Sequence, residues 1–184
     1  MNKTYELQIA GLTRKLPIVR ITDSLSIASF VILGDAELVT RAAQELSKKI
    51  PEVDYLITAE AKGIPLVQEL AHILGMSRYF VARKSIKPYM MNPVITEVYS
   101  ITTQAKQILC LSEEESELIH GKRVLIVDDV ISTGDSVKAM ESLVKKAGGK
   151  IAGKAAILAE GDAAKRNDII FLEKLPVFPV KPSR

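Results

Sequence analysis

The segment VLIVDDVISTGDSV, residues 124–137, constrains the fold more than any other part of the chain. Four apolar residues lead directly into two adjacent acids, Asp128 and Asp129, and then into a turn of small residues. Helical spacing follows in SVKAMESLVKKAGG, and a second apolar run follows in KIAGKAAILAE. An apolar run without period-two alternation is typical of a strand that is buried on both faces. The segment therefore predicts a strand, a turn, a helix and a parallel strand, which together make one βαβ unit.

The same order of elements occurs earlier in the chain. Asp35 begins an amphipathic helix, DAELVTRAAQELSKKI, which Pro51 ends. Residues 54–60 then predict a short strand, residues 63–75 return to helical spacing, and residues 79–83 predict another strand. This repetition predicts the α/β class, with a doubly wound, mostly parallel sheet.

Two segments depart from the alternation. Residues 84–112 contain Pro88 and Pro93 and predict a β-hairpin or a mobile flap inserted between the units. The tail contains Pro176, Pro179 and Pro182, and we expect it to run irregularly over the surface. Because no linker composition or internal repeat divides the 184 residues, we expect one domain.

Composition narrows the classes of function. The 25 Lys and Arg residues exceed the 22 Asp and Glu residues by three without forming a long basic block, so we expect no nucleic-acid partner. No stretch approaches the ~18 apolar residues of a membrane span, and the N-terminus has no apolar signal-peptide run, so we expect a cytoplasmic protein. The single cysteine, Cys110, lies in an alternating context that is typical of a core strand.

Ligands of open α/β sheets bind at the carboxyl ends of the strands. Three loops leave predicted strands at this edge: residues 60–63, residues 83–87 and residues 128–136. The chain has no G-x-G pair and no G-K-[ST] sequence, which excludes the dinucleotide fingerprint and the Walker loop. The turn from Ser132 to Ser136 offers another way to bind phosphate, through backbone N–H groups, two hydroxyl donors and the positive N-terminus of the next helix.

The two acids precede this turn at the predicted strand end. Neighbouring side chains of a strand project to opposite faces, so both acids reach one ligand only after a bend. Carboxylates beside a phosphate site would accept hydrogen bonds from sugar hydroxyls. The alternative interpretation is a strand whose polar end meets solvent.

These residues carry a resemblance to a known family. VLIVDDVISTGDSV closely resembles the motif with which type I phosphoribosyltransferases bind 5-phosphoribosyl-1-pyrophosphate (PRPP). EAKG at residues 60–63 is similar to the pyrophosphate loop of the adenine and xanthine enzymes, which read E-A-[RS]-G, and RKSIK at residues 83–87 is similar to the adenine enzyme's R-K-P-G-K. The resemblance is firm over residues 35–160. It implies the type I phosphoribosyltransferase fold, with residues 1–34 as a hood over the base and residues 84–112 as a flexible flap.

The resemblance also implies roles for individual residues. The expected catalytic residues are Asp128 and Asp129, which would hold the ribose hydroxyls, together with Arg83 and Lys87. The 5′-phosphate would be bound by Ser132, Thr133, Gly134, Asp135 and Ser136. The pyrophosphate would be bound by Ala61, Lys62, Gly63 and Lys84. Mg²⁺ is the implied cofactor, held mainly by the oxygens of PRPP and with no direct protein ligand.

Two segments of the sequence disagree about which base accepts the ribosyl group. EVYSITT in the predicted flap resembles V-Y-S-F-T of the xanthine enzymes, whereas RKSIK and the opening segment resemble the adenine branch. The expected base pocket comprises Val19, Arg20, Phe30 and Ile131. Phe30 either stacks on the purine or belongs to the core. Glu97 and Tyr99 either cover the site from a closed flap or face solvent.

The expected function is transfer of a phosphoribosyl group to a purine, with adenine favoured. The alternatives are another purine, xanthine among them, and a regulator that senses PRPP without catalysis. Two departures weaken the match: Asp135 replaces the glycine of most purine members, and Lys62 replaces the arginine of the adenine enzyme. The expected partners are PRPP and a purine base, and because the relatives are usually dimers, a homodimer.

Overall fold

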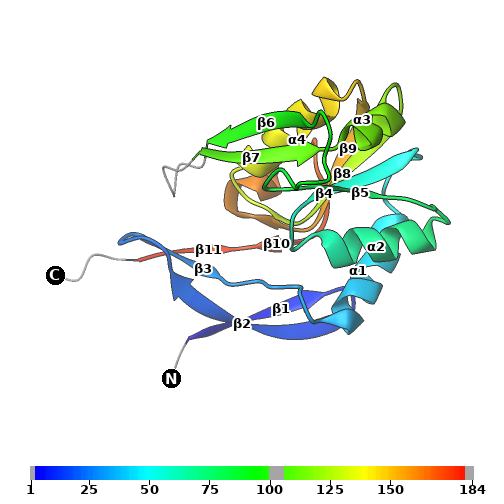
Figure 1. The fold of residues 1–184 in the computed structure, drawn as a ribbon. Coiled ribbons are helices and arrows are strands. Elements are labelled where there is room, and N and C mark those ends of the chain that lie inside the picture. The colour runs from blue at the N-terminus through cyan, green and yellow to red at the C-terminus, as the bar shows by residue number, and fades with distance from the viewer. Residues whose placement is uncertain (1–2, 100–105, 181–184) are drawn as a thin grey trace.

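A five-stranded parallel sheet forms the centre of the computed structural model, which describes residues 3–99 and 106–180 (Figure 1). Its strands lie in the order β10-β9-β8-β4-β5, and each pairs with its neighbours in parallel. Their bounds are β4 (Tyr55–Ala59), β5 (Phe80–Ala82), β8 (Arg123–Ile131), β9 (Lys150–Glu160) and β10 (Ile170–Leu175). The predicted α/β fold is confirmed.

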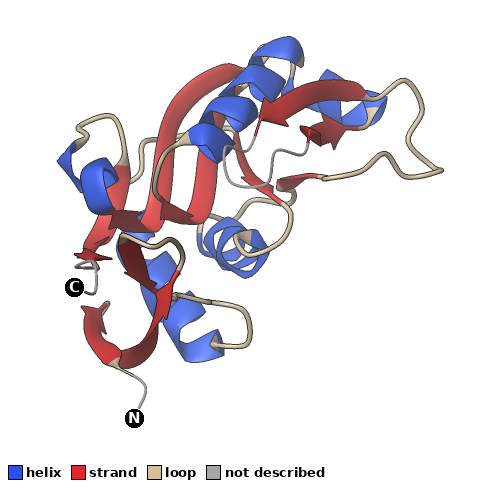
Figure 2. Ribbon diagram, turned by 90° about the vertical axis from the view of Figure 1, so that its left-hand side faces the viewer, coloured by secondary structure: helices blue, strands red, loops and turns tan. Residues whose placement is uncertain are grey.

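Helices cover both faces of this sheet (Figure 2). Helices α1 (Ala36–Ser47) and α2 (Ile64–Ile73) share one apolar cluster with the N-terminal strands. Helix α4 (Asp135–Lys146) and Ile119, the last residue of α3 (Glu113–Ile119), share the cluster of the other face. A short 3-10 helix, η1 (Gly161–Lys165), follows β9. In the part of the chain that the structure describes, no helix has the length and apolar character needed to span a membrane.

An antiparallel sheet in the order β1-β2-β3-β11 forms the hood below the central sheet in Figure 1. Its strands are β1 (Thr4–Ile9), β2 (Leu12–Arg20), β3 (Leu25–Ala28) and β11 (Val177–Pro179). The expected irregular tail was therefore wrong for residues 177–179. As an edge strand, β11 tolerates a proline that lacks an N–H donor, and the Phe178 ring packs edge-on against Tyr5 at 5.8 Å.

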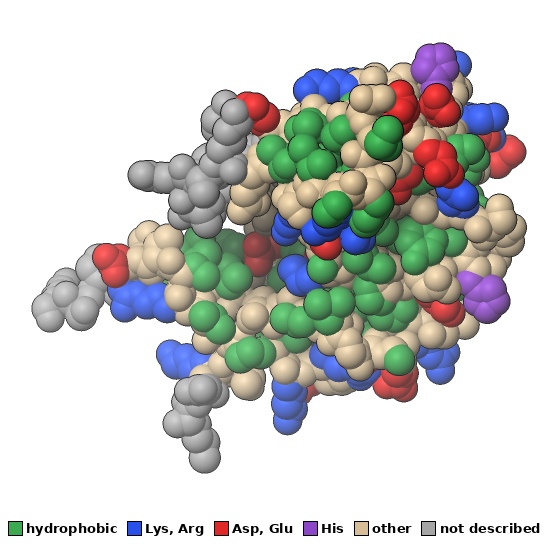
Figure 3. All heavy atoms as spheres, in the orientation of Figure 1, with side chains coloured by type: hydrophobic (Ala, Val, Ile, Leu, Met, Phe, Trp, Pro, Cys, Tyr) green, Lys and Arg blue, Asp and Glu red, His purple; other side chains and the backbone are tan. Residues whose placement is uncertain are grey.

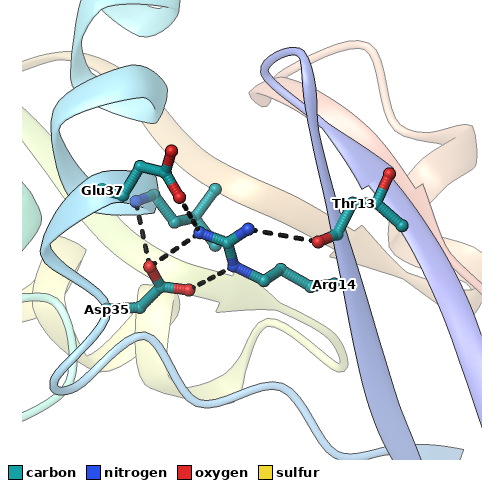
Figure 4. Close-up of polar contacts among 5 residues, drawn as sticks. Thr13, Arg14, Asp35 and Glu37 are labelled. Atoms are coloured by element: carbon teal, nitrogen blue, oxygen red, sulfur yellow. Dashed lines mark hydrogen bonds and ion pairs between the residues drawn. The ribbon is translucent and has the colours of Figure 1, made fainter.

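Arg14 ties the hood to the start of α1 (Figure 4). Its Nε and Nη2 donate to the two carboxylate oxygens of Asp35 at 2.6 and 3.0 Å, and Nη2 also donates to Glu37 at 2.8 Å. Asp35 accepts from the Leu38 N–H at 3.1 Å, as the sequence predicts for a capping residue. The hydrogen bonds from Arg14 lower the pKa of Asp35. The N-cap of α1 thus fixes the position of the hood strand β2.

The segment inserted at residues 84–112 contains the predicted hairpin, formed by β6 (Val94–Tyr99) and β7 (Lys106–Leu111). The hairpin packs against α4, where Thr96 Oγ1 donates to Ser142 Oγ at 3.1 Å and Lys146 Nζ donates to the Ile95 carbonyl at 2.8 Å. Cys110 is buried, and its backbone pairs with Arg83, the residue that follows β5. The base of the hairpin is therefore joined to the edge of the central sheet.

Candidate active site

The three loops that the sequence singles out lie at the carboxyl edge of the parallel sheet. Two of them are joined by hydrogen bonds: the Glu60 N–H donates to the Ala82 carbonyl at 3.0 Å, and the Lys84 N–H donates to Glu60 Oε2 at 3.0 Å. These bonds hold the loop after β4 against the loop after β5. The third loop follows β8, which pairs directly with β4.

Strand β8 carries the acid pair and continues to Ile131, so the acids do not end the strand as the sequence suggested. Leu125 and Val127 belong to the α2 side of the core, while Val124 and Ile126 belong to the α4 side. This alternation changes phase at the acids, because Val130 packs against the α2-side cluster while Ile131 lies in a cluster with Val137 of α4.

The acids are electrostatically coupled at close range. Asp128 Oδ1 accepts the Asp129 N–H at 2.9 Å, and Asp129 is only 2% exposed. Burial, with repulsion from Asp129 as the next contribution, raises the pKa of Asp128 to about 7. A proton, a cation or a hydroxyl donor therefore stabilises this site.

Lys62 lies across the acid pair, a contact that the sequence did not suggest. Its Nζ is 3.1 Å from Asp129 Oδ2, in the geometry of an ion pair rather than of a hydrogen bond. Among residues 3–99 and 106–180, Asp129 Oδ2 has no hydrogen-bond donor although it is buried. Buried polar atoms are normally hydrogen-bonded, so this oxygen suits an incoming donor.

Gly63 brings the loop after β4 close to β8. A Cβ at this position would overlap the hydroxyl of the buried Thr58 and would lie 3.5 Å from Asp128 Cα. Only glycine fits without a shift of backbone or side chain. Thr58 is therefore one of the residues that pack the site. The sequence did not indicate this role, because a β-branched residue is common in an apolar strand.

The small-residue turn leads into α4 as the sequence predicts. Gly134 is the N-cap of α4 with φ of +86°, a left-handed conformation that favours glycine. No described side chain caps the helix, so its first N–H groups are positioned to bind an anion. The Thr133 hydroxyl donates to Asp135 Oδ2 at 2.9 Å. Ser132, Thr133 and Ser136 are exposed.

A cluster of cations surrounds Glu60. The hydrogen bond from the Lys84 N–H lowers the pKa of this carboxyl, and the charges of Arg83, Lys87 and Lys84 lower it further. Lys87 Nζ donates to Ser85 Oγ at 2.6 Å. The structure thus brings the loop cations together beside the loop that contains Ala61, Lys62 and Gly63.

Arg83 has a second environment. Its side chain lines a cavity of about 550 Å³, and its buried Nε has no acceptor among the described residues. The other residues around this cavity come from residues 78–91 and from the start of α3, and the acid pair is not among them. Arg83 therefore joins the expected pyrophosphate loop to a separate cavity.

The four residues expected to contact the base occupy different environments. Phe30 and Ile131 are buried, at 6% and 2% exposure. Val19 is 44% exposed, and Arg20 bonds to the carbonyls of Thr22 and Asp23 in the hood turn. Val19 pairs across the hood with Ile27, which pairs with Val177.

Val177 lies at the edge of the hood, a position that the sequence did not suggest because its strand comes from the tail. A Cβ on Gly161 would lie 3.4 Å from Val177 Cγ1, so this hood edge contacts the segment directly after β9. Figure 3 shows a hollow beside the hood, with hydrophobic side chains on its left, Lys or Arg side chains on its right and an acidic group at its floor. Glu160, the last residue of β9, also lies at this sheet edge, and burial raises its pKa.

The two flap residues are only partly visible. Glu97 is exposed on β6. Tyr99 ends the same strand, and its side chain lies outside the described part of the structure.

The acidic side chains at this edge are few for a protein-held Mg²⁺ site. Within the two described ranges, no group of three or more His, Cys, Asp or Glu side chains is placed to hold a metal ion. Mg²⁺ prefers carboxylate and phosphate oxygens. The unsatisfied Asp129 Oδ2 fits an ion that a phosphate ligand carries into the site.

Comparison with known proteins assigns the chain to a family. The profile described as "Phosphoribosyl transferase domain" matches residues 33–183. The xanthine phosphoribosyltransferase of Lactobacillus helveticus is 30% identical over 144 residues, which are 75% of this chain and 72% of that protein. The hypoxanthine/guanine phosphoribosyltransferase of Methanotorris igneus is 36% identical over 129 residues, which are 70% of this chain and 65% of that protein.

A solved structure supports the same assignment. The adenine phosphoribosyltransferase of Thermoanaerobacter pseudethanolicus superposes with a TM-score of 0.64 at 25% identity, covering 78% of this chain and 84% of that one. The three relatives thus carry three different purine specificities. The chain belongs to the type I phosphoribosyltransferase family, in its purine branch.

Proposed function

We propose that the chain transfers the 5-phosphoribosyl group of PRPP to a purine base, with adenine the favoured acceptor. The observation that carries the proposal is the meeting, at one sheet edge, of the acid pair, the uncapped N-terminus of α4 and the cation cluster around Glu60. These three features match the three parts of PRPP: the ribose with its hydroxyls, the 5′-phosphate and the pyrophosphate.

The reaction breaks the bond from C1′ to the pyrophosphate oxygen and forms a bond from C1′ to a ring nitrogen of the base. Pyrophosphate leaves with the electron pair, and the base loses a proton. Positive charge develops on the ribose while negative charge develops on the leaving group, so fixed charges of opposite sign lower the barrier. Asp128 and Asp129 serve the ribose in this proposal, and Lys62, Lys84, Lys87 and Arg83 serve the pyrophosphate.

Lys62 has two successive partners in this mechanism. Without ligand its ammonium is 3.1 Å from Asp129 Oδ2. A ribose hydroxyl that donates to Asp129 would replace this contact, and Lys62 would then turn to the pyrophosphate. Its half-exposed side chain leaves room for this movement. Mg²⁺, held mainly by PRPP, neutralises part of the charge of the leaving group when bound.

Adenine is favoured because RKSIK and the hood segment resemble the adenine branch, and because the Thermoanaerobacter adenine enzyme shares the fold over most of the chain. Xanthine is the second candidate, favoured by EVYSITT and by the Lactobacillus relative. A homodimer is part of the proposal, supported by three exposed apolar side chains in one loop, Ile86, Tyr89 and Met91.

The deciding experiment measures nucleotide formation from PRPP and Mg²⁺ with adenine, xanthine, hypoxanthine and guanine in separate reactions. We expect the highest kcat/KM with adenine, and we expect activity to elute from a sizing column at the mass of a dimer. A higher kcat/KM with another purine would change the base assigned to this protein and leave the assigned reaction unchanged. Binding of PRPP without reaction of any purine would establish the sensor function instead.

Replacing Lys87 with alanine should lower kcat about 10- to 100-fold, because it removes one charge from the group that stabilises the leaving pyrophosphate. The Lys87 side chain bonds only to Ser85 among the described residues, so we expect an unchanged melting temperature. The control is Lys49→Ala, an exposed lysine after α1 at the amino edge of the sheet. A wild-type kcat for Lys87→Ala would remove this residue from the mechanism.

A further inference from the structure

The turn between β8 and α4 contains more negative charge than a phosphate-binding turn should have. Asp135 lies within it and accepts the Thr133 hydroxyl proton at 2.9 Å. Among the described residues it forms an ion pair with Lys138, whose Nζ is 3.9 Å from Asp135 Oδ1 and whose side chain is 71% exposed. A solvent-exposed pair at this distance contributes little. A dianionic phosphate at this turn therefore needs positive charge from another element.

Arg166, just beyond η1, contacts this turn from outside. Its Nη1 is 2.7 Å from the position that a Cβ of Gly134 would occupy. The guanidinium thus fills the space that a side chain at the N-cap of α4 would need. Only glycine at position 134 admits both the left-handed backbone and this arginine.

The guanidinium is held in a fixed orientation by a chain of ion pairs. Its Nε and Nη2 donate to the two oxygens of Asp168 at 2.8 and 2.7 Å. Asp168 also pairs with Lys154 at 2.7 Å, and Lys154 pairs with Glu141 on α4 at 2.7 Å. A bidentate pair fixes the plane of an arginine and occupies one edge of it.

This orientation leaves one end of the arginine directed at the turn. Nη1 takes no part in the pair with Asp168, and no acceptor for it occurs among the described residues. The side chain is 30% exposed, so it is accessible to a ligand without being fully solvated. An arginine that is fixed on one edge and open at the other is well suited to bind phosphate oxygens.

We propose that Arg166 binds the 5′-phosphate of the substrate and supplies positive charge that offsets the negative charge of Asp135 at the turn before α4. The inference rests on the proposed function. It assigns a residue outside the PRPP motif to phosphate binding, and it explains how a chain with aspartate in this turn retains a site for a dianion.

The experiment measures the affinity of the full chain for two probes, ribose 5-phosphate and inorganic pyrophosphate, by titration calorimetry with Mg²⁺. Arg166→Gln should weaken ribose 5-phosphate binding about 10- to 100-fold, the effect of one charge-assisted hydrogen bond, and leave pyrophosphate binding within about twofold. Lys165→Gln is the matched control, since this neighbouring lysine is 81% exposed and pairs with Asp162. We expect it to bind both probes as the wild type does.

A second substitution tests directly whether the charge of Arg166 compensates for that of Asp135. Asp135→Asn should strengthen ribose 5-phosphate binding, and in the Arg166→Gln background it should restore part of the lost affinity. Unchanged ribose 5-phosphate affinity in Arg166→Gln, or an equal loss for both probes, would overturn the proposal. If ribose 5-phosphate affinity is unchanged in Arg166→Gln while the wild type forms nucleotide, the proposal for Arg166 fails and the proposed function stands. A wild type that binds PRPP and forms no nucleotide would reject the proposed function, whatever the result for Arg166.

Discussion

Replacing Asp128 and Asp129 together with asparagine should lower kcat by about three orders of magnitude or more. Removing a single group aimed at charge in a transition state costs about 10²- to 10³-fold, and here both carboxylates that we propose to face the ribosyl cation are lost. The measurement is nucleotide formation at saturating PRPP and purine. Glu173→Gln, an exposed acid on β10, is the control. Turnover within about tenfold of wild type would contradict the assignment of the acid pair.

Stability should change in the opposite direction to activity. The pKa of Asp128 is raised to about 7 in the folded chain, against about 4 for an ordinary aspartate. A folded state that holds this proton more tightly loses stability as the pH rises from about 4 to about 7, and the loss is complete above that range. Asp128→Asn removes this penalty, so the single variant should melt at a higher temperature than wild type at pH 8, with a gain that shrinks towards pH 4. A lower melting temperature at pH 8 would point to misfolding instead.

The sequence predicted four of the five strands of the central sheet, all except β10, because their apolar runs and the helical spacing between them are local signals. The segment from Val124 to Gly149 contains its own strand, turn and helix in order, and the structure reproduces them. The loops at the carboxyl edge followed from the parallel sheet alone. Hence the acid pair, the turn before α4 and the cation loops were all found from pattern and resemblance.

The remaining features depend on contacts between segments far apart in the chain. Val177 joins the hood because three tail residues pair with β3, and no local pattern distinguishes such a short edge strand from an irregular tail. The ion pair of Lys62 with Asp129 spans two loops. Arg166 reaches Gly134 only because η1 returns the chain to the start of α4. These contacts arise from tertiary packing, which composition and periodicity do not encode.

Gly63→Ala should be the most damaging single change outside the acid pair. The added methyl group would overlap the hydroxyl of Thr58 on β4 and press on the Thr58 Cβ at 3.2 Å, so the loop that contains Lys62 must move away from β4. Overpacking of this kind costs about 1–3 kcal/mol of stability, and displacement of a positioned group by about 1 Å can cost about 10²-fold in rate. We therefore expect kcat/KM for PRPP to fall about 100-fold, measured by nucleotide formation, with a smaller fall in melting temperature.

A compensating substitution distinguishes this mechanism from general destabilisation. Thr58→Ala removes the hydroxyl that the methyl group would strike, while the Thr58 Cβ, 3.2 Å from the added atom, remains. The double variant Thr58→Ala/Gly63→Ala should thus recover part, but not all, of kcat/KM. Thr58→Ala alone should change kcat/KM little, because the hydroxyl makes only a 3.5 Å bond to the Ala59 carbonyl. Additive losses in the double variant would show that the two positions act independently, and the contact with the Thr58 side chain would then not be what requires glycine at position 63.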